Sequence, residues 1–345
     1  MFEKEDNYIM KSDDIIMKAA IIHILDSSVG IPVLSDQAME IGPDFSDFLK
    51  AHIEKITESD DIKQCSFSDS SPLKELIENC TPDNFVETSK QLAENLYDIM
   101  NSNIDIPAAD IAILVFSCEG CDYLGFLKMN YKTSYTHATR EAEGGNRNDI
   151  ILQRALLPAQ GQKLSEAFIV NLSDGSILLT EKKYEVNGEK RFYFSELFLE
   201  CHAPLSQKSK LDIVTRAVEQ VNKKYYGDEA PERRMEIKNV LCTELEEAGE
   251  IKVATIKEKI FPDSPEMQVE LDEKLDKYNM SYETVQPKSE QTIKKFQKQH
   301  LTTDTGIEIS IPMEEYRNPD HVEFITNEDG TISVLIKNIG QLISR

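Results

Sequence analysis

The fold is decided by residues 111–129, which read Ile111-Ala112-Ile113-Leu114-Val115-Phe116-Ser117-Cys118-Glu119-Gly120-Cys121-Asp122-Tyr123-Leu124-Gly125-Phe126-Leu127-Lys128-Met129. The segments 111–116 and 123–129 are short, largely apolar runs, which are typical of β-strands. Three further runs follow at 167–172, 177–186 and 191–199, and the dipeptides Asp174-Gly175 and Asn187-Gly188 separate them. Because these dipeptides readily adopt the positive φ angles of tight β-turns, we predict an antiparallel meander.

The chain before residue 111 combines a strand with helices. Residues 19–26 form an apolar segment that ends at turn residues, which predicts a buried strand. Residues 44–56 and 84–100 place apolar side chains at spacings of three and four, with acidic residues on the opposite faces, as in amphipathic helices. After the second β-run, residues 133–160 are polar and contain Gly144-Gly145, so we expect a long connection or a mobile loop there.

The chain after residue 205 shows a helical pattern and then a return to β character. Pro204 and the polar residues 206–209 predict a domain boundary, and helices are expected before Gly227, from Pro231 to Gly249, and after Ser264-Pro265. Residues 307–311, 322–325 and 331–336 have the alternation of strands. The predicted class is therefore α+β. An N-terminal domain (1–205) has acidic helices and the antiparallel sheet, and a C-terminal domain (206–345) has helices followed by a small antiparallel sheet.

Composition restricts the classes of function. The 345 residues include 38 Lys+Arg against 62 Asp+Glu, a formal net charge of -24, which taken alone argues against a nucleic-acid partner. No apolar run is long enough to span a bilayer, and Met1–Asp6 lacks the features of a secretory signal. We therefore expect a cytoplasmic protein with no membrane partner.

The charge is unevenly distributed along the chain. Residues 1–110 hold 8 basic and 23 acidic side chains, whereas residues 123–163 and 286–300 are locally positive. A solvated surface is the plain interpretation of such stretches, and a phosphate-binding surface is the alternative. The segment from Lys294 to His300 clusters cations either as a helix or as a strand, so both geometries stay open. The candidate DNA-binding residues are Lys128, Lys132, Arg140, Arg147, Arg154, Lys294, Lys295 and Lys298.

Catalytic and metal-binding patterns are weak. The pair Cys118-x-x-Cys121 provides two zinc ligands, and Cys201-His202 would have to supply the other two. The usual second C-x-x-C is absent. We therefore interpret these cysteines as packing or turn residues and expect no metal. Asp174, Glu181 and Lys183 have the loose order of a metal-dependent nuclease, but ion pairs on a solvated strand face explain them better. No phosphate-binding glycine motif occurs. We expect no enzyme, no catalytic residue and no cofactor.

The C-terminal segment has a distinctive order of strand and turn residues. It runs Phe296-Gln297-Lys298-Gln299-His300-Leu301-Thr302-Thr303-Asp304-Thr305-Gly306-Ile307-Glu308-Ile309-Ser310-Ile311-Pro312, then Val322-Glu323-Phe324-Ile325, Asp329-Gly330-Thr331-Ile332 and Ile336-Lys337-Asn338-Ile339. This order resembles the ending of the bacterial nucleoid-associated protein family (the NdpA/YejK type), and residues 20–26 are similar to its first strand. The resemblance implies a cytoplasmic protein of the nucleoid that binds DNA with little sequence preference and is not an established enzyme. It carries over no binding motif, so the candidate residues rest on local charge.

Three hypotheses follow. The primary one is a nucleoid-associated, DNA-binding homodimer that contacts phosphates and organises the chromosome. The second is a metal-dependent nuclease that uses Asp174, Glu181 and Lys183. The third is a scaffold whose acidic N-terminal half binds a basic partner among other chromosome-maintenance proteins.

Overall fold

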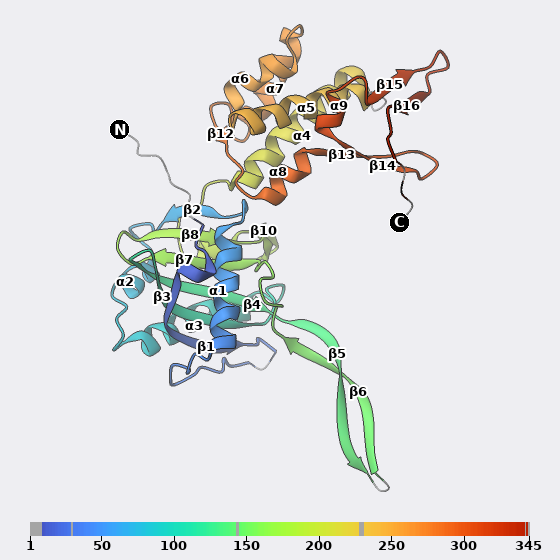
Figure 1. Ribbon diagram of the computed structural model, residues 1–345. Coiled ribbons are helices and arrows are strands. Elements are labelled where there is room, and N and C mark those ends of the chain that lie inside the picture. Colours follow the sequence, from blue (N-terminus) through green and yellow to red (C-terminus); the bar gives the residue numbers. More distant parts are fainter. Residues whose placement is uncertain (1–8, 29, 143–144, 228–230, 342, 344–345) are drawn as a thin grey trace. The chain divides into compact units, whose positions relative to one another are not determined.

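The chain divides between Leu205 and Ser206 into two compact units (Figure 1). The computed structural model describes residues 9–28, 30–142, 145–227, 231–341 and 343. Met1–Asp6, Val29 and Gly144, which entered the sequence predictions, lie outside these residues. We call residues 1–205 unit 1 and residues 206–345 unit 2. Unit 1 combines an antiparallel sheet with helices, and unit 2 combines helices with short antiparallel strands, so the predicted α+β class is confirmed.

Unit 1 is built on a six-stranded sheet in the order β1-β3-β4-β7-β8-β2. Every neighbouring pair is antiparallel, and the residues that decide the fold form its central hairpin, with Cys118 paired to Cys121 at the turn. The strands are β1 (Ile15–Leu25), β2 (Lys63–Ser66), β3 (Ala109–Cys118), β4 (Cys121–Asn130), β7 (Glu166–Asn171) and β8 (Ser176–Thr180). The 3₁₀ turn η1 (Ser12–Asp14) precedes β1.

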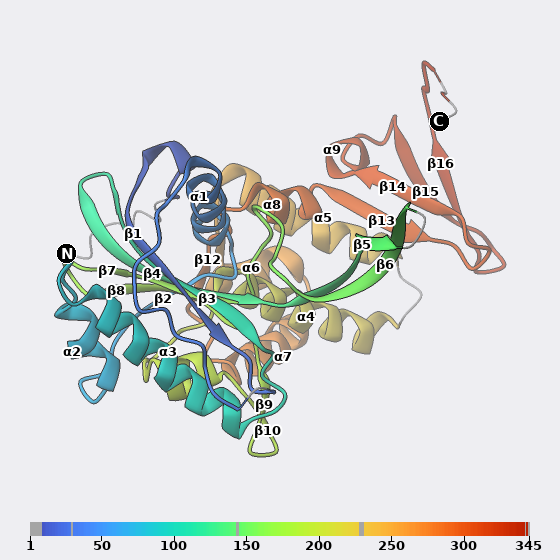
Figure 2. The same cartoon turned by 90° about the horizontal axis from the view of Figure 1, so that it is seen from below.

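Helices cover both faces of this sheet. Helix α1 (Pro43–Thr57) lies on one face, and α2 (Pro72–Glu78) and α3 (Phe85–Ser102) lie on the other (Figure 2). Successive residues of β3 point to opposite faces, so Ile113 packs in the core of α3 and Leu114 in the core of α1. Because β3 and β4 are buried on both faces, they are continuous apolar runs without alternation.

Both predicted hairpin turns of the meander are found, but its second run is divided and its third run is not a continuous strand. β7 and β8 pair around Asp174-Gly175, but β8 ends at Thr180. β9 (Tyr184–Val186) and β10 (Glu189–Arg191) form a separate hairpin, whose turn residues Asn187 and Gly188 have φ of 53° and 83°. The expected strand 191–199 contains instead the short π-helix η2 (Phe194–Phe198), because one helical turn lets both phenylalanines contact the ring of Phe126.

The expected loop at 133–160 is also wrong. β5 (Lys132–Ala142) and β6 (Gly145–Leu156) pair with each other as a long two-stranded sheet. The side chains of this segment are mostly exposed, and its apolar residues at 150–152 are consecutive, so the period of two that identifies a half-buried strand is missing.

Unit 2 is a helical cluster with short β-hairpins. The first helix ends before Gly227 (φ 77°), as the sequence predicts, and at its start the side chain of Ser206 accepts from the backbone N–H of Ser209. The helices are α4 (Gln207–Tyr226), α5 (Pro231–Glu247), α6 (Val253–Ile260), α7 (Pro265–Asp276), α8 (Glu290–Phe296) and α9 (Met313–Tyr316). The strands pair as β11 (Ile251–Lys252) with β12 (Thr284–Val285), β13 (Lys298–Thr302) with β14 (Glu308–Pro312), and β15 (Val322–Thr326) with β16 (Ile332–Ile336).

One charged pair lies in the interior of unit 1. Lys128 of β4 faces Glu166 of β7, their side chains are 0% exposed, and Lys128 Nζ donates to Glu166 Oε2 at 3.0 Å. Asn130 and the hydroxyl groups of Tyr184 and Tyr193 also donate to this carboxylate. Burial lowers the pKa of Lys128, whereas the carboxylate of Glu166 acts in the opposite direction. Glu166 therefore joins β4, β9 and the start of η2.

We predict that Glu166→Gln lowers the free energy of unfolding by about 3–5 kcal/mol, because it leaves the Lys128 ammonium group buried without its counter-charge. Urea unfolding at pH 7 measures the change. The control is Asp122→Asn, which breaks the half-exposed Lys18–Asp122 pair and is expected to lower the same free energy by less than about 1 kcal/mol. Equal losses in the two variants would contradict this role of Glu166.

Candidate nucleic-acid interface

The most exposed element of unit 1 is the β5–β6 hairpin, which we call the ribbon (residues 132–156). Figure 1 shows it extending away from the six-stranded sheet, and its register runs from Lys132 opposite Leu156 to Ala142 opposite Gly145. It leaves the sheet directly after β4. Because directly opposed residues of an antiparallel pair point to the same side, this register defines two faces of the ribbon.

One face holds two opposed arginines near the turn. Arg140 and Arg147 are exposed and lie directly opposite each other, and Arg147 Nε donates to Asp149 Oδ1 at 2.9 Å. Within the described part of the chain, no acidic side chain pairs with Arg140. Opposed like charges destabilise a strand pair, and an anion bound between them removes that repulsion. This face therefore suits a phosphate group.

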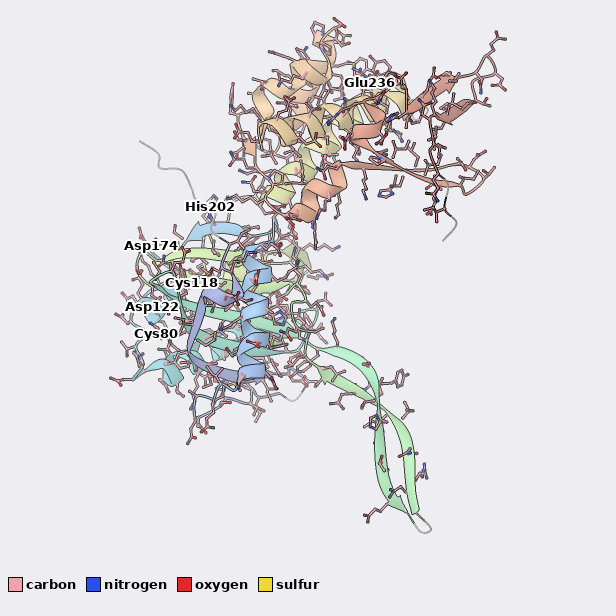
Figure 3. The ribbon with its side chains drawn as sticks, viewed as in Figure 1. Cys80, Cys118, Asp122, Asp174, His202 and Glu236 are labelled. Atoms are coloured by element: carbon pink, nitrogen blue, oxygen red, sulfur yellow. The ribbon has the colours of Figure 1, made fainter. Side chains whose placement is uncertain are left out.

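The other face is apolar in its middle. Tyr135 lies opposite Leu152 and His137 lies opposite Ile150, and the exposed fractions of Tyr135 and Ile150 are 73% and 71%. Figure 3 shows side chains projecting from both strands of the ribbon. A two-stranded hairpin that packs against nothing is only marginally stable in water, and these residues give the ribbon an exposed apolar surface.

The remaining predicted cations of unit 1 have different positions. Lys132 and Arg154 are exposed at the root of the ribbon, where Lys132 donates to the side chain of Gln162. The prediction for Lys128 is wrong, because this side chain is 0% exposed inside the sheet and is paired with Glu166. No phosphate can reach an ammonium group in that position.

The three predicted lysines of unit 2 lie where α8 meets β13, so the segment 294–300 is part helix and part strand. Lys294 pairs with Glu290 on α8 at 2.7 Å. Lys295 is exposed and points into a pocket, whereas Lys298 is exposed on the first residue of β13. The two geometries that the sequence left open therefore both occur, on successive residues.

This pocket is formed by α4, α5, α8 and β13 of unit 2 and has a volume of about 690 Å³. Its cationic lining residues outnumber its one carboxylate, that of Glu219. Lys238 Nζ donates to the backbone carbonyl of Lys298 at 2.6 Å, and burial lowers the pKa of Lys238. The cationic residues that line the pocket are Arg216, Lys223, Arg234, Lys238 and Lys295.

The sequence predicted only Lys295 among these cations. The helical spacings of Arg216 with Lys223 and of Arg234 with Lys238 place each pair on one helix face. This spacing could have indicated a cationic site. However, it is common in charged helices, and it does not show which helix faces pack against each other in the fold.

The residues of the nuclease hypothesis have structural roles. Glu181 lies just after β8, where it pairs with Lys63 at 2.7 Å and accepts from the backbone N–H of Ser195. Asp174 accepts from the backbone N–H of Ser176 in the β7–β8 turn. Lys183 lies over the ring of Phe192. These contacts hold the three side chains in separate local interactions, and the structure does not support the hypothesis.

The cysteines of the zinc hypothesis are also separated. Cys118 and Cys121 face each other across the β3–β4 turn, whereas Cys201 Sγ lies 3.6 Å from Cys65 Sγ. Figure 3 marks Cys118 and His202, both in unit 1. Across the residues that the structure describes, no three His, Cys, Asp or Glu side chains gather as metal ligands.

The family model described as nucleoid-associated protein YejK matches residues 21–343. A search of curated proteins found no match. Since the match covers nearly the whole chain, the chain belongs to the nucleoid-associated protein YejK family, which confirms the resemblance of its C-terminal segment. Membership gives the protein a nucleoid-associated role and a location at the nucleoid in the cytoplasm, and the family description names no enzymatic reaction. In the described residues, no helix is long and apolar enough to cross a membrane.

We predict that shortening the ribbon changes the free energy of unfolding of unit 1 by less than about 1 kcal/mol, because its removal exposes little buried apolar area. The variant deletes residues 136–151 and joins Tyr135 to Leu152 through Asn-Gly, since these two residues are directly opposed and a two-residue turn can connect them. Urea unfolding of both proteins measures the difference. A loss of several kcal/mol would show that the ribbon belongs to the core.

Proposed function

We propose that the protein binds duplex DNA through the ribbon, by phosphate contacts with little sequence preference, and acts in chromosome organisation. The observation that carries the proposal is the pair Arg140 and Arg147, opposed on an exposed ribbon with no acid paired to Arg140 among the described residues. The nucleoid-associated role of the family supports it.

The dimensions of the ribbon suit a DNA groove. The major groove is about 12 Å wide and admits a two-stranded β-ribbon. The 11 residues of β5 span roughly 35 Å at about 3.4 Å per residue, which is close to one helical turn of DNA, about 34 Å. Lys132 and Arg154 at the root of the ribbon add two cations to Arg140 and Arg147 near its turn.

The three lysines of unit 2 are proposed as a second phosphate-binding surface. Lys294, Lys295 and Lys298 are exposed, and Lys294 has one carboxylate neighbour, Glu290. Lys128 has no part in the proposal, because it is buried. The proposal includes no catalytic residue, metal ion or cofactor. Binding of another chromosome-maintenance protein by the acidic N-terminal half stays a prediction.

The proposed assembly is a homodimer that covers the apolar face of the ribbon. Tyr135, Ile150 and Leu152 lie on the face opposite to Arg140 and Arg147, so a second copy can contact one face while DNA contacts the other. Pairing two ribbons also doubles the cations that one assembly presents to DNA.

We predict that replacing Arg140 and Arg147 by alanine reduces the salt dependence of DNA binding, because each lost phosphate contact lowers the slope of log K against log salt by about 0.9. The double variant is expected to lower the slope by about 2 per ribbon. Fluorescence anisotropy with random-sequence duplexes between 50 and 200 mM salt measures it.

The control for this experiment replaces Lys182 and Lys190, two exposed lysines of unit 1 outside the ribbon, by alanine. This variant loses the same charge and is expected to keep the slope of the unmodified protein. A slope that is identical in all three proteins, or no binding at 50 mM salt, would rule out the ribbon as the DNA-binding element.

We predict that the double substitution Tyr135→Ser and Ile150→Ser converts a dimer into a monomer, because it removes the exposed apolar side chains that the second copy covers. Size-exclusion chromatography with light scattering measures the mass. Ile104→Ser, at a residue of unit 1 that is 94% exposed outside the ribbon, is the control and leaves the mass unchanged. A monomeric unmodified protein at micromolar concentration contradicts the dimer.

A further inference from the structure

The cationic pocket of unit 2 has buried polar atoms without partners on its wall. Asn222 is 2% exposed, and its Oδ1 has no hydrogen-bond partner among the described residues. The buried Oγ1 of Thr215 is likewise unpaired within them. Both residues line the pocket. Leaving a buried polar atom unsatisfied costs about 1–3 kcal/mol, so a small side-chain movement that opens these atoms to the pocket gains hydrogen bonds from a ligand.

The two polar residues lie on the same side of α4. They are seven positions apart, which is nearly two helical turns, or roughly 10 Å along the helix axis. The hydroxyl of a helical threonine commonly bonds to a carbonyl of the preceding turn, but Thr215 Oγ1 makes no such bond here. A ligand with two separated polar groups can therefore bind along this side of the helix.

The charge of the pocket selects an anion. Its five cations face one carboxylate, although unit 2 as a whole has 20 basic and 27 acidic side chains. Of these cations, Arg216 and Lys295 form no ion pair with any residue that the structure describes. A strongly cationic lining creates a local positive potential, which attracts anionic ligands such as phosphates.

The remaining wall of the pocket is apolar and includes an aromatic ring. Ile237 and Leu241 are buried residues of the helical core, and Phe296 packs against that core while remaining half-buried. The volume of about 690 Å³ lies within the range of roughly 300–1,000 Å³ that is usual for small-molecule sites. An aromatic surface beside hydrogen-bonding groups suits a heterocyclic base.

We propose that this pocket binds a nucleoside phosphate, with the phosphate at Arg216 and Lys295, the base against Phe296, and base or sugar polar groups at Asn222 and Thr215. A free mononucleotide and one nucleotide of a single-stranded nucleic acid share this chemistry. The site lies in unit 2 and does not depend on the binding of duplex DNA by the ribbon in unit 1, although it shares Lys295 with the proposed phosphate-binding surface of unit 2.

The test is calorimetric titration of the full chain with AMP, adenosine, inorganic phosphate and a ten-residue oligodeoxyadenylate. We expect AMP to bind at least tenfold more tightly than adenosine or phosphate, because only AMP uses both the cationic and the apolar walls. Competition by the oligonucleotide identifies a strand as the source of the ligand, and AMP binding without competition identifies a free nucleotide. No binding of AMP, or equal binding of AMP and phosphate, overturns the proposal.

Variants separate the site from the fold. Lys295→Ala and Asn222→Leu are each expected to weaken AMP binding at least tenfold, and Asn222→Leu keeps or raises the melting temperature because it removes an unsatisfied buried carbonyl oxygen. Lys277→Ala removes an exposed cation of unit 2 outside the pocket and is the control, with unchanged affinity. Equal affinity in all of these proteins refutes the site. The double variant Arg140→Ala, Arg147→Ala keeps its AMP affinity, so failure of the ribbon proposal is distinguishable from failure of this one.

Discussion

The buried ion pair between Lys128 and Glu166 is the constraint on which unit 1 depends. β4 and β7 are central strands covered on both faces, so a charged residue there requires a partner at the same register position. Glu166 accepts from the Lys128 ammonium group and from three neutral donors, and in doing so holds the β9 hairpin and the start of η2 against the sheet. Lys128 and Asn130 lie at the end of β4, and Glu166 lies at the start of β7. The network therefore also fixes the two strand ends between which the ribbon is inserted.

Local signals in the sequence predicted much of the fold, because the interactions behind them are themselves local. Gly227 and the Asp174-Gly175 and Asn187-Gly188 turns each act within a few residues, and all three are found where expected. Lys128 was wrongly predicted to be exposed because its partner, Glu166, is 38 residues away and the residues next to Lys128 do not indicate this pair. The ribbon was taken for a loop because a strand without a buried face has no hydrophobic period to detect.

The candidate sites likewise combine residues that the sequence identifies with contacts that only the fold produces. Arg140 and Arg147 were found by counting charge along a short segment, but their opposition across the ribbon follows from the register of β5 and β6. The pocket of unit 2 joins Arg216 of α4 to Lys295 of α8, and only the packing of these helices brings them to one cavity. An unpaired buried atom such as Asn222 Oδ1 cannot be predicted from the sequence. It is identified only because no hydrogen-bond partner lies near it among the described residues.

The length of the ribbon separates its cations near the turn from the acidic body of unit 1. Unit 1 has 18 basic and 35 acidic side chains, and a binding surface on its sheet or helices would meet the repulsion of that net negative charge. Arg140 lies eight residues beyond Lys132, roughly 27 Å along an extended strand. At physiological ionic strength the Debye length is about 8 Å, so the field of the remaining acidic side chains is largely screened at that distance. The arginines near the turn therefore experience little of the field of the acidic side chains on the sheet and helices, and their acidic neighbours are those of the ribbon itself, such as Glu141 and Asp149.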